Sequence, residues 1–410
     1  MTRATAYNIT LLWLAWLVIL LIFQWIVTAR LDIQHPDLAV SWTKSQTMPS
    51  SNEGKIYLLN PIMNRQVAWD SEYYVGIAVA GYDDPNAGAV VNPETGREVI
   101  KNYSFFPLYP YVMRVFALPF RVLGVNPIGA ASLAGVVVAG LGTLAGLFAL
   151  WSLTRPYFSE EDSHRAVFYL LIFPTAFFFA MVYTEGLFIG LAFGALALSR
   201  HGHWVGASLL GLLAAWTRAH GAAIALPLLV FWLMQIRWRE PLRPQITRGW
   251  WLRGASALLP LVGYLLWRTS GLGAGWAELQ EFYFGRGLFS IRNSIEAWGY
   301  AFEYALSLGG GHAQVYLGIE VGAIILAMIA SLWLLRQDPA TALFSLAIVL
   351  LSVLSGSAGS MARYMLIVPA IYIFLAHLGK NRTFDRAWTL FSILLLGMQA
   401  TLFASEMWVG

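Results

Sequence analysis

Long apolar runs separated by short polar segments dominate the chain. The first run, Ile9–Val27, matches the roughly 20 apolar residues that a bilayer crossing needs, and Arg3 and Arg30 flank it. It is too long for the apolar core of a signal peptide, so we expect an uncleaved first helix. Further spans are predicted at Pro127–Leu153, Ala166–Val182, Glu185–Ser199, Val205–Trp216, Ala222–Ile236, Ala255–Trp267, Val315–Leu335, Thr341–Ser355, Tyr364–His377 and Ala387–Ala404. The pattern predicts an all-α polytopic membrane protein with about 11 transmembrane helices.

The composition excludes several other classes of protein. Hydrophobic residues make up 58% of the 410 residues and charged residues only 12%, whereas soluble domains carry about 25% charged residues. The net charge of +4 does not indicate nucleic-acid binding, because cytoplasmic loops of membrane proteins carry a positive excess. The chain has no Cys, which removes disulfides, thiolate metal sites and Cys nucleophiles.

The charges of the short loops predict the orientation. Ile236–Gly254 and Gly379–Arg386 are rich in Arg and Lys, and such loops face the cytoplasm. Two long segments then lie on the exterior or lumenal side: residues 31–126, with interfacial helices, and residues 269–314. We expect one membrane-embedded domain over residues 1–410.

The first exterior loop holds the most informative sequence. Trp69, Tyr73, Ile77 and Ala80 recur at spacings of three and four, which predicts an interfacial helix. Asp70 stands at the start of this helix, among aromatic residues suited to the membrane interface. A carboxylate in that place would lie beside lipid headgroups.

Three motifs together resemble a known family. Trp69-Asp70 is followed by Ile-Ala-x-x-Gly-Tyr and then by Phe-Phe-Pro-Leu-Tyr-Pro at 105–110, with Arg114 four residues on. Tyr-Thr-Glu-Gly-Leu-Phe at 183–188 follows an aromatic Phe-Pro segment, and Thr-Arg-Ala-His-Gly occupies 217–221. These motifs resemble the PIG-V family, the second GPI mannosyltransferase family, over about Trp69 to Gly221.

The resemblance implies a fold and a chemistry. It places the chain in the GT-C class of integral-membrane glycosyltransferases, which use a polyprenyl-phosphate sugar donor and a catalytic carboxylate in the first exterior loop. Asp70 takes that place by resemblance. Several members of the class carry Asp-x-Asp, but here Asp-Ser-Glu ends in Glu72, which makes Glu72 a second catalytic candidate.

The remaining candidates follow from the same reaction. A carboxylate must take the proton of the attacking hydroxyl, and cations must stabilise the departing phosphate. Glu185, Arg218, His220, Arg363, Arg114 and Lys101 are the candidate substrate-binding residues. No metal site is expected. No cofactor is required, and a divalent metal is compatible but not indicated, because Arg or Lys can neutralise the phosphate.

Each candidate also has a purely structural interpretation. Asp70 is a candidate helix N-cap, and Glu72 a solvated loop acid. Glu185 would favour a helix N-terminus by its charge. Arg218 would reach the interface by snorkelling.

We expect transfer of mannose, or a related hexose, from a polyprenyl-phosphate donor to a hydroxyl of a glycolipid-type acceptor, inverting to an α-linkage. The lipid bilayer is the other partner, and nucleic acid is not one. The active site would face the exterior of a plasma membrane or the lumen of the endoplasmic reticulum. The alternatives are a transporter or flippase for a lipid-linked sugar and a non-catalytic membrane scaffold. A transporter would place ionisable residues near the membrane midplane, whereas these candidates gather at one face.

Overall fold

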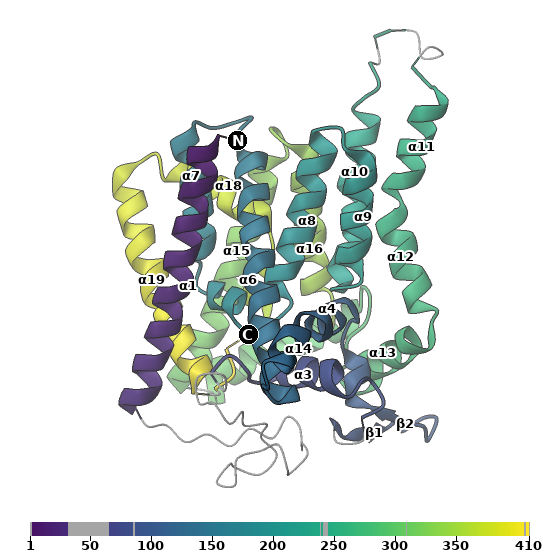
Figure 1. Cartoon of the computed structure of the whole chain (residues 1–410), viewed down its shortest axis with the longest axis vertical. Coiled ribbons are helices and arrows are strands. Elements are labelled where there is room, and N and C mark those ends of the chain that lie inside the picture. The colour runs from purple at the N-terminus through teal and green to yellow at the C-terminus, as the bar shows by residue number, and fades with distance from the viewer. Residues whose placement is uncertain are drawn as a thin grey trace.

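The computed structural model of the chain is mainly helical, and its longer helices run between two ends of the molecule (Figure 1). It describes residues 2–31, 65–84, 87–237, 239–240, 245–308, 310–405 and 407–409. The elements up to residue 215 are α1 (Arg3–Leu31), α3 (Asp70–Val79), β1 (Ala89–Val91), β2 (Glu98–Ile100), η3 (Lys101–Ser104), α4 (Leu108–Phe116), α5 (Leu118–Val122), α6 (Pro127–Thr154), α7 (Glu160–Leu171), η4 (Ala176–Ala180), α8 (Glu185–Arg200) and α9 (Trp204–Ala215). The later elements are η5 (Ala219–Ile224), α10 (Ala225–Leu233), α11 (Arg248–Ala257), α12 (Leu259–Arg268), α13 (Gly271–Phe282), α14 (Ile291–Glu303), η6 (Tyr304–Leu308), α15 (Gly310–Leu334), α16 (Pro339–Val353), α17 (Met361–Met365), α18 (Pro369–Leu378) and α19 (Arg382–Ala404). The helical class expected from the sequence is confirmed.

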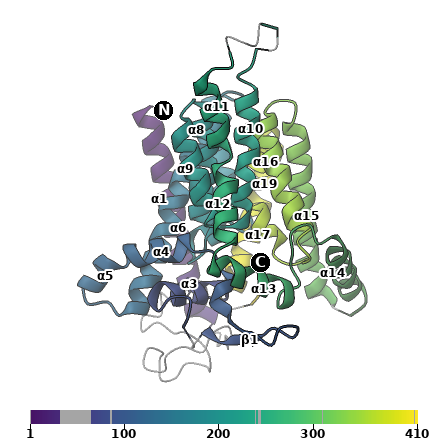
Figure 2. The same cartoon turned by 90° about the vertical axis from the view of Figure 1, so that its right-hand side faces the viewer.

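The two ends of the molecule differ. One end carries the start of α1 and the connection between α10 and α11 (Figure 1). The other end carries α3, α4, α13, α14 and the β1–β2 hairpin, and Figure 2 shows these elements at the same end from the side. We call this second end the loop-rich end.

The outer surface of the bundle is apolar. In the described part, α1, α6, α15 and α19 are long and apolar enough to cross a membrane, and several shorter apolar helices accompany them. Large hydrophobic side chains such as Ile22, Leu266, Ile329 and Leu394 are exposed on different helices. In water such a surface would be unfavourable, whereas lipid tails solvate it. The chain is an integral membrane protein, and the exact number of spans stays a prediction.

Three of the expected spans are interrupted. Ala166–Val182 is wrong as a single helix, because α7 ends at Leu171 before Pro174 and a separate 3-10 turn, η4, follows. Proline cannot donate the backbone hydrogen bond that would continue the helix. The span expected at Ala255–Trp267 is likewise divided into α11 and α12 near Pro260, and the one at Tyr364–His377 into α17 and α18 at Pro369.

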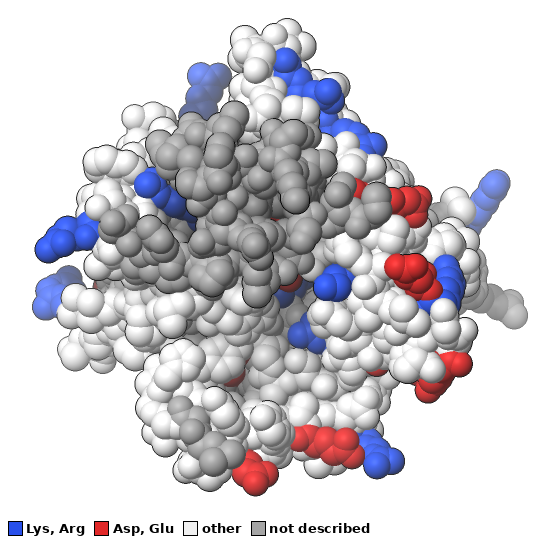
Figure 3. All heavy atoms as spheres, turned by 90° about the horizontal axis from the view of Figure 1, so that it is seen from below, with Lys and Arg blue, Asp and Glu red and all other residues white. Residues whose placement is uncertain are grey.

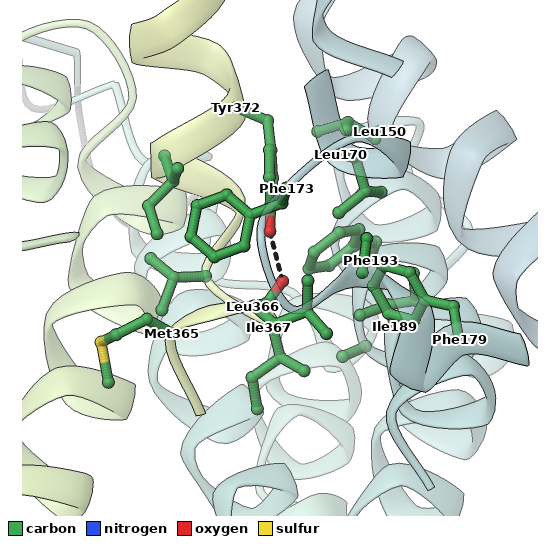
Figure 4. Packing of buried hydrophobic residues seen from close by; sticks show 14 of the residues in the cluster. Leu150, Leu170, Phe173, Phe179, Ile189, Phe193, Met365, Leu366, Ile367 and Tyr372 are labelled. Carbon is green, nitrogen blue, oxygen red and sulfur yellow. Dashed lines mark hydrogen bonds between the residues drawn. The ribbon is translucent and has the colours of Figure 1, made fainter. Parts of the chain in front are cut away.

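The last of these breaks lies inside the hydrophobic core. Tyr372 in α18 donates a hydrogen bond of 2.7 Å across the break to the carbonyl of Leu366, and Phe173 packs edge-on against the Tyr372 ring (Figure 4). The backbone carbonyl freed by the break is thereby satisfied inside the protein, as a membrane interior requires.

Glycines bring α6 and α8 into direct backbone contact. A Cβ atom at Gly186 would lie 2.1 Å from the Ala139 carbonyl oxygen, and one at Gly190 would lie 2.5 Å from that of Gly142. Small residues allow this approach, as the Gly-rich sequence of α6 predicts. The contact fixes the start of α8, where Glu185 lies.

The two long segments that the sequence predicts to lie on the exterior side pack together at the loop-rich end. The Asn92 amide donates to the Glu278 carboxylate at 2.6 Å, and Phe106 packs edge-on against Trp276 with ring centroids 5.4 Å apart. Gly275 lies against the Tyr103 side chain. Residues 32–64 of the first segment lie outside the described residues. The part that is described shares one surface with the second segment.

Candidate active site

Asp70 is the first residue of α3. The residue before it, Trp69, has a positive φ of 58° and occupies the N-cap position. The N-cap interpretation of Asp70 is therefore wrong. Its carboxylate instead accepts a hydrogen bond from Arg363 Nη1 at 2.9 Å, across 293 positions of sequence.

Glu185 lies at the start of α8 and is completely buried. Arg218 donates to its carboxylate and also to the Thr184 hydroxyl, the latter at 2.9 Å. The first turn of α8 adds the positive end of a helix dipole beside the same carboxylate. A buried carboxylate is costly unless it is paired, and Arg218 supplies that pairing.

Arg363 connects these two carboxylates. Its Nε lies 3.6 Å from Glu185 Oε1 while its Nη1 holds Asp70. The guanidinium also lies 5.3 Å from the centroid of the Tyr183 ring and 5.5 Å from that of the Phe178 ring. Aromatic faces stabilise a cation at such distances. Asp70, Arg363, Glu185 and Arg218 thus form a row of alternating charge, which we call the charge row.

A further arginine contacts Tyr364, whose ring also lies beside the two arginines of the charge row. Arg286, in the segment between α13 and α14, donates to the Tyr364 hydroxyl at 3.1 Å and to the Ser357 hydroxyl at 3.3 Å. The Arg218 and Arg363 guanidiniums lie 5.4 and 5.5 Å from the centroid of the same Tyr364 ring. Within the described residues, Arg286 forms no ion pair with a carboxylate.

The other sequence-derived candidates occupy different places. His220 shares a hydrogen bond of 3.0 Å with Ser352, and its ring lies 5.6 Å from that of Tyr364, so it borders the cluster. Glu72 is fully buried in α3. Arg114 donates to the carbonyls of Ile77 and Ala78 at the C-terminal end of α3.

The candidate Lys101 and the acid Asp83 lie near the surface of the first long segment. Lys101 lies over the ring of Tyr283, with Nζ 5.7 Å from the centroid. Asp83 accepts a hydrogen bond from Tyr103 at 2.6 Å, and this bond raises the pKa of Tyr103 to about 12. Asp83 thus stabilises the fold of this segment through its hydrogen bond with Tyr103.

One buried acid was missed by the sequence analysis. Glu320 in α15 is 1% exposed and accepts hydrogen bonds from the backbone N–H groups of Ser360 and Ala362, just before Arg363. It is the only acid within the apolar run Val315–Leu335, and an ionisable group inside a span signals function. The sequence alone could therefore have identified Glu320 as a candidate.

The loop-rich end is hollowed near its middle. Lys and Arg atoms are visible in this hollow, while acidic groups lie toward the edge of the same face (Figure 3). Among the described residues, no group of three or more His, Asp or Glu residues is placed to hold a metal ion.

Comparison with known families identifies the chain. The profile of the family described as mannosyltransferase (PIG-V) matches residues 8–248, more than half of the 410 residues. The match places the chain among the membrane glycosyltransferases. The chain belongs to the PIG-V mannosyltransferase family, and the resemblance drawn from its motifs is confirmed. A comparison with curated proteins gives no match.

Several solved structures are similar at low sequence identity. The archaeal oligosaccharyltransferase AglB from Archaeoglobus fulgidus, in complex with an inhibitory peptide and a dolichol-phosphate, has a TM-score of 0.48 and 14% identity, covering 97% of this chain and 56% of that one. ArnT from Cupriavidus metallidurans bound to undecaprenyl phosphate has a TM-score of 0.45 and 15% identity, covering 83% and 73%. Its apo state has a TM-score of 0.43 and 17% identity, covering 83% and 72%. This chain thus spans little more than half the length of the archaeal protein.

Proposed function

We propose that the protein is a GT-C glycosyltransferase that moves a mannose from a polyprenyl-phosphate donor to a hydroxyl of a glycolipid-type acceptor. The observation that carries the proposal is the charge row, in which family motifs far apart in sequence meet at the loop-rich end of a membrane protein. A lipid-linked sugar has its reacting atoms at such a membrane boundary, while its isoprenoid tail is solvated by apolar surface.

Exposure supports Asp70 as the general base. Its side chain is 27% exposed, whereas those of Arg363 and Glu185 are 7% and 0% exposed. The base must come within hydrogen-bond reach of the acceptor hydroxyl, and Asp70 is the most open carboxylate of the row. Arg363 would hold its orientation through the hydrogen bond already formed.

Charge balance supports Arg286 as the first cation to meet the donor phosphate. Arg218 and Arg363 are each paired with a carboxylate, while Arg286 bonds to neutral hydroxyl groups. The phosphate would form an ion pair with Arg286 beside Tyr364. Arg218 and His220, which also lie beside the Tyr364 ring, would be close to it. Cations placed at the leaving phosphate lower the barrier where negative charge collects.

The reaction is a single displacement. The acceptor oxygen attacks the anomeric carbon as its proton passes to Asp70, and the bond from that carbon to the phosphate oxygen breaks with its electron pair going to the phosphate. A β-linked donor would give an α-linked product by inversion. No residue of the charge row need bond to the sugar.

Transfer of labelled mannose from synthetic polyprenyl-phosphate mannose into glycolipid acceptors tests the proposal. Asp70→Asn keeps the shape but removes the base, and general-base catalysis is worth roughly 10²–10⁴-fold, so turnover should fall by that order. Glu296→Gln is the matched control, because Glu296 is an exposed acid of α14 paired only with Arg292. Near-normal turnover by purified, folded Asp70→Asn would remove Asp70 from the mechanism.

A further inference from the structure

A non-glycine residue with positive φ lies directly before each of the two helices that carry the Asp70–Arg363 pair. Trp69, with φ of 58°, precedes α3, and Ser360, with φ of 68°, precedes α17. Residues other than glycine avoid this backbone conformation, and they keep it only where the surrounding contacts hold it in place. The contacts around these two residues therefore set the geometry of the pair.

The backbone at Ser360 is held by one face of α15. The Glu320 carboxylate accepts from the N–H of Ser360 at 3.1 Å and from that of Ala362 at 2.5 Å. Tyr316 lies one helical turn earlier, and its hydroxyl accepts from the Ser360 N–H at 3.3 Å. Both contacts act on the backbone just before Arg363.

Trp408 contacts both Tyr316, which holds the backbone at Ser360, and Trp69, which precedes Asp70. Its indole Nε1 donates to the Tyr316 hydroxyl at 3.2 Å, and its ring meets the Trp69 ring edge-on, with centroids 5.3 Å apart. Trp408 itself is 38% exposed and its neighbour Val409 is 3% exposed, so one side of this segment packs against the protein. Both figures of the whole chain place its C-terminal end at the loop-rich end (Figures 1 and 2).

We infer that Trp408 is a positioning residue that ties the backbone before Asp70 to the backbone before Arg363 and so fixes the geometry of this pair. The inference rests on the proposed function for its kinetic consequence only. Misplacement of a catalytic group by about 1 Å can cost 10²-fold in rate. Trp408 touches neither Arg286 nor Arg218 through any contact described above, so donor binding should not depend on it.

The kinetic test separates turnover from donor binding. Trp408→Ala should lower kcat by roughly 10- to 100-fold and leave the KM for polyprenyl-phosphate mannose within about twofold. Trp408→Phe keeps the ring contact but loses the N–H, so its loss should be smaller. Trp388→Phe is the matched control, because Trp388 lies in α19, where it packs against Phe384 and against Tyr169 of α7. An unchanged kcat in Trp408→Ala, or a loss confined to KM, would overturn the inference.

A double-mutant cycle tests the link through Tyr316. Trp408→Phe and Tyr316→Phe remove the same hydrogen bond from its two sides, so the double variant should be about as slow as the worse single variant. Contacting residues give such non-additive effects, whereas distant ones add. Trp388→Phe combined with Tyr316→Phe should be additive. Additivity in the first pair would contradict the coupling.

Hydrogen exchange gives a readout that needs no transfer activity. Trp408→Ala should speed amide exchange both in peptides that cover 69–72 and in peptides that cover 360–364. Trp388→Phe should change exchange in neither region. If both peptides respond but the wild type transfers no sugar, the coupling stands and the proposed function fails. If neither or only one responds, the coupling is wrong. If Trp408→Ala does not fold, amide exchange in the same two regions is compared between Trp408→Phe and Trp388→Phe.

Discussion

The pairing of each ionised side chain decides which role it can take in the charge row. Glu185 is fully buried, and Arg218 is the cation that donates to it. This makes Arg218 a structural partner as well as a candidate phosphate ligand. Replacing Arg218 alone therefore perturbs two properties at once, and a loss of transfer in that variant would not by itself show contact with the donor.

We expect Arg218→Gln to lower stability by about 3–5 kcal/mol, because it leaves the Glu185 charge buried without its main partner. Adding Glu185→Gln should restore part of this loss, since the site then holds two neutral amides. Arg237→Gln is the control: its pair with Glu240 is exposed, with side chains 76% and 53% accessible, and is worth at most about 1 kcal/mol. Thermal unfolding in detergent measures all three variants. A double variant less stable than Arg218→Gln would contradict the argument.

Arg286 gives a cleaner test of the phosphate site, because it bonds to hydroxyl groups and leaves no buried carboxylate behind. Arg286→Gln should weaken binding of a polyprenyl phosphate roughly 10- to 100-fold, the value of a charge-assisted hydrogen bond of about 1.5–3 kcal/mol. Arg292→Gln is matched in charge and lies in the next helix, but Arg292 is 90% exposed. It should bind normally. Equal affinity of the two variants for polyprenyl phosphate would move the phosphate site elsewhere.

At the scale of elements, the contact between α6 and α8 sets the position of Glu185. We expect Gly186→Ala to destabilise the protein by about 1–3 kcal/mol, because the new methyl group would meet the Ala139 carbonyl at 2.1 Å and push the helices apart. Gly318→Ala in α15 is the control, since nothing lies within 4 Å of its Cβ position. It should gain up to about 1 kcal/mol from helix propensity. A neutral Gly186→Ala in thermal unfolding would show that the two helices can separate without cost.

The same elements show how far the sequence could be interpreted. Asp70, Glu185 and Arg218 were identified because each stands at the edge of an apolar run inside a recognisable motif. The interruption at Pro174 was missed because the apolar run continues through it, and hydropathy does not register a lost backbone donor. The pairing of Asp70 with Arg363 spans 293 positions of sequence. It also depends on the positive φ of Trp69 and Ser360, which no local sequence pattern predicts.

At the scale of the whole molecule, the charge row and the Arg-rich connection lie at opposite ends. The connection between α10 and α11 includes Arg237 and Arg239 against Glu240, and Arg248 begins α11. Figure 1 shows this connection at the end away from α3 and α13. Loops rich in Arg and Lys stay in the cytoplasm during insertion. We therefore propose that the loop-rich end faces the exterior or the lumen.

Cysteine labelling tests this orientation, and the absence of native Cys leaves no background to remove. Glu94→Cys, in the exposed turn between β1 and β2, should react with an impermeant thiol reagent added to intact cells or sealed, correctly oriented vesicles. Thr247→Cys, exposed beside α11, should react only after the membrane is opened. Labelling of both positions in the detergent-solubilised protein controls for reactivity. If both react from one side of the sealed membrane, the two ends do not face opposite compartments and the bundle cannot cross the bilayer as proposed. If Thr247→Cys alone reacts from outside, the orientation is reversed, and the donor sugar must then be presented on the cytoplasmic face.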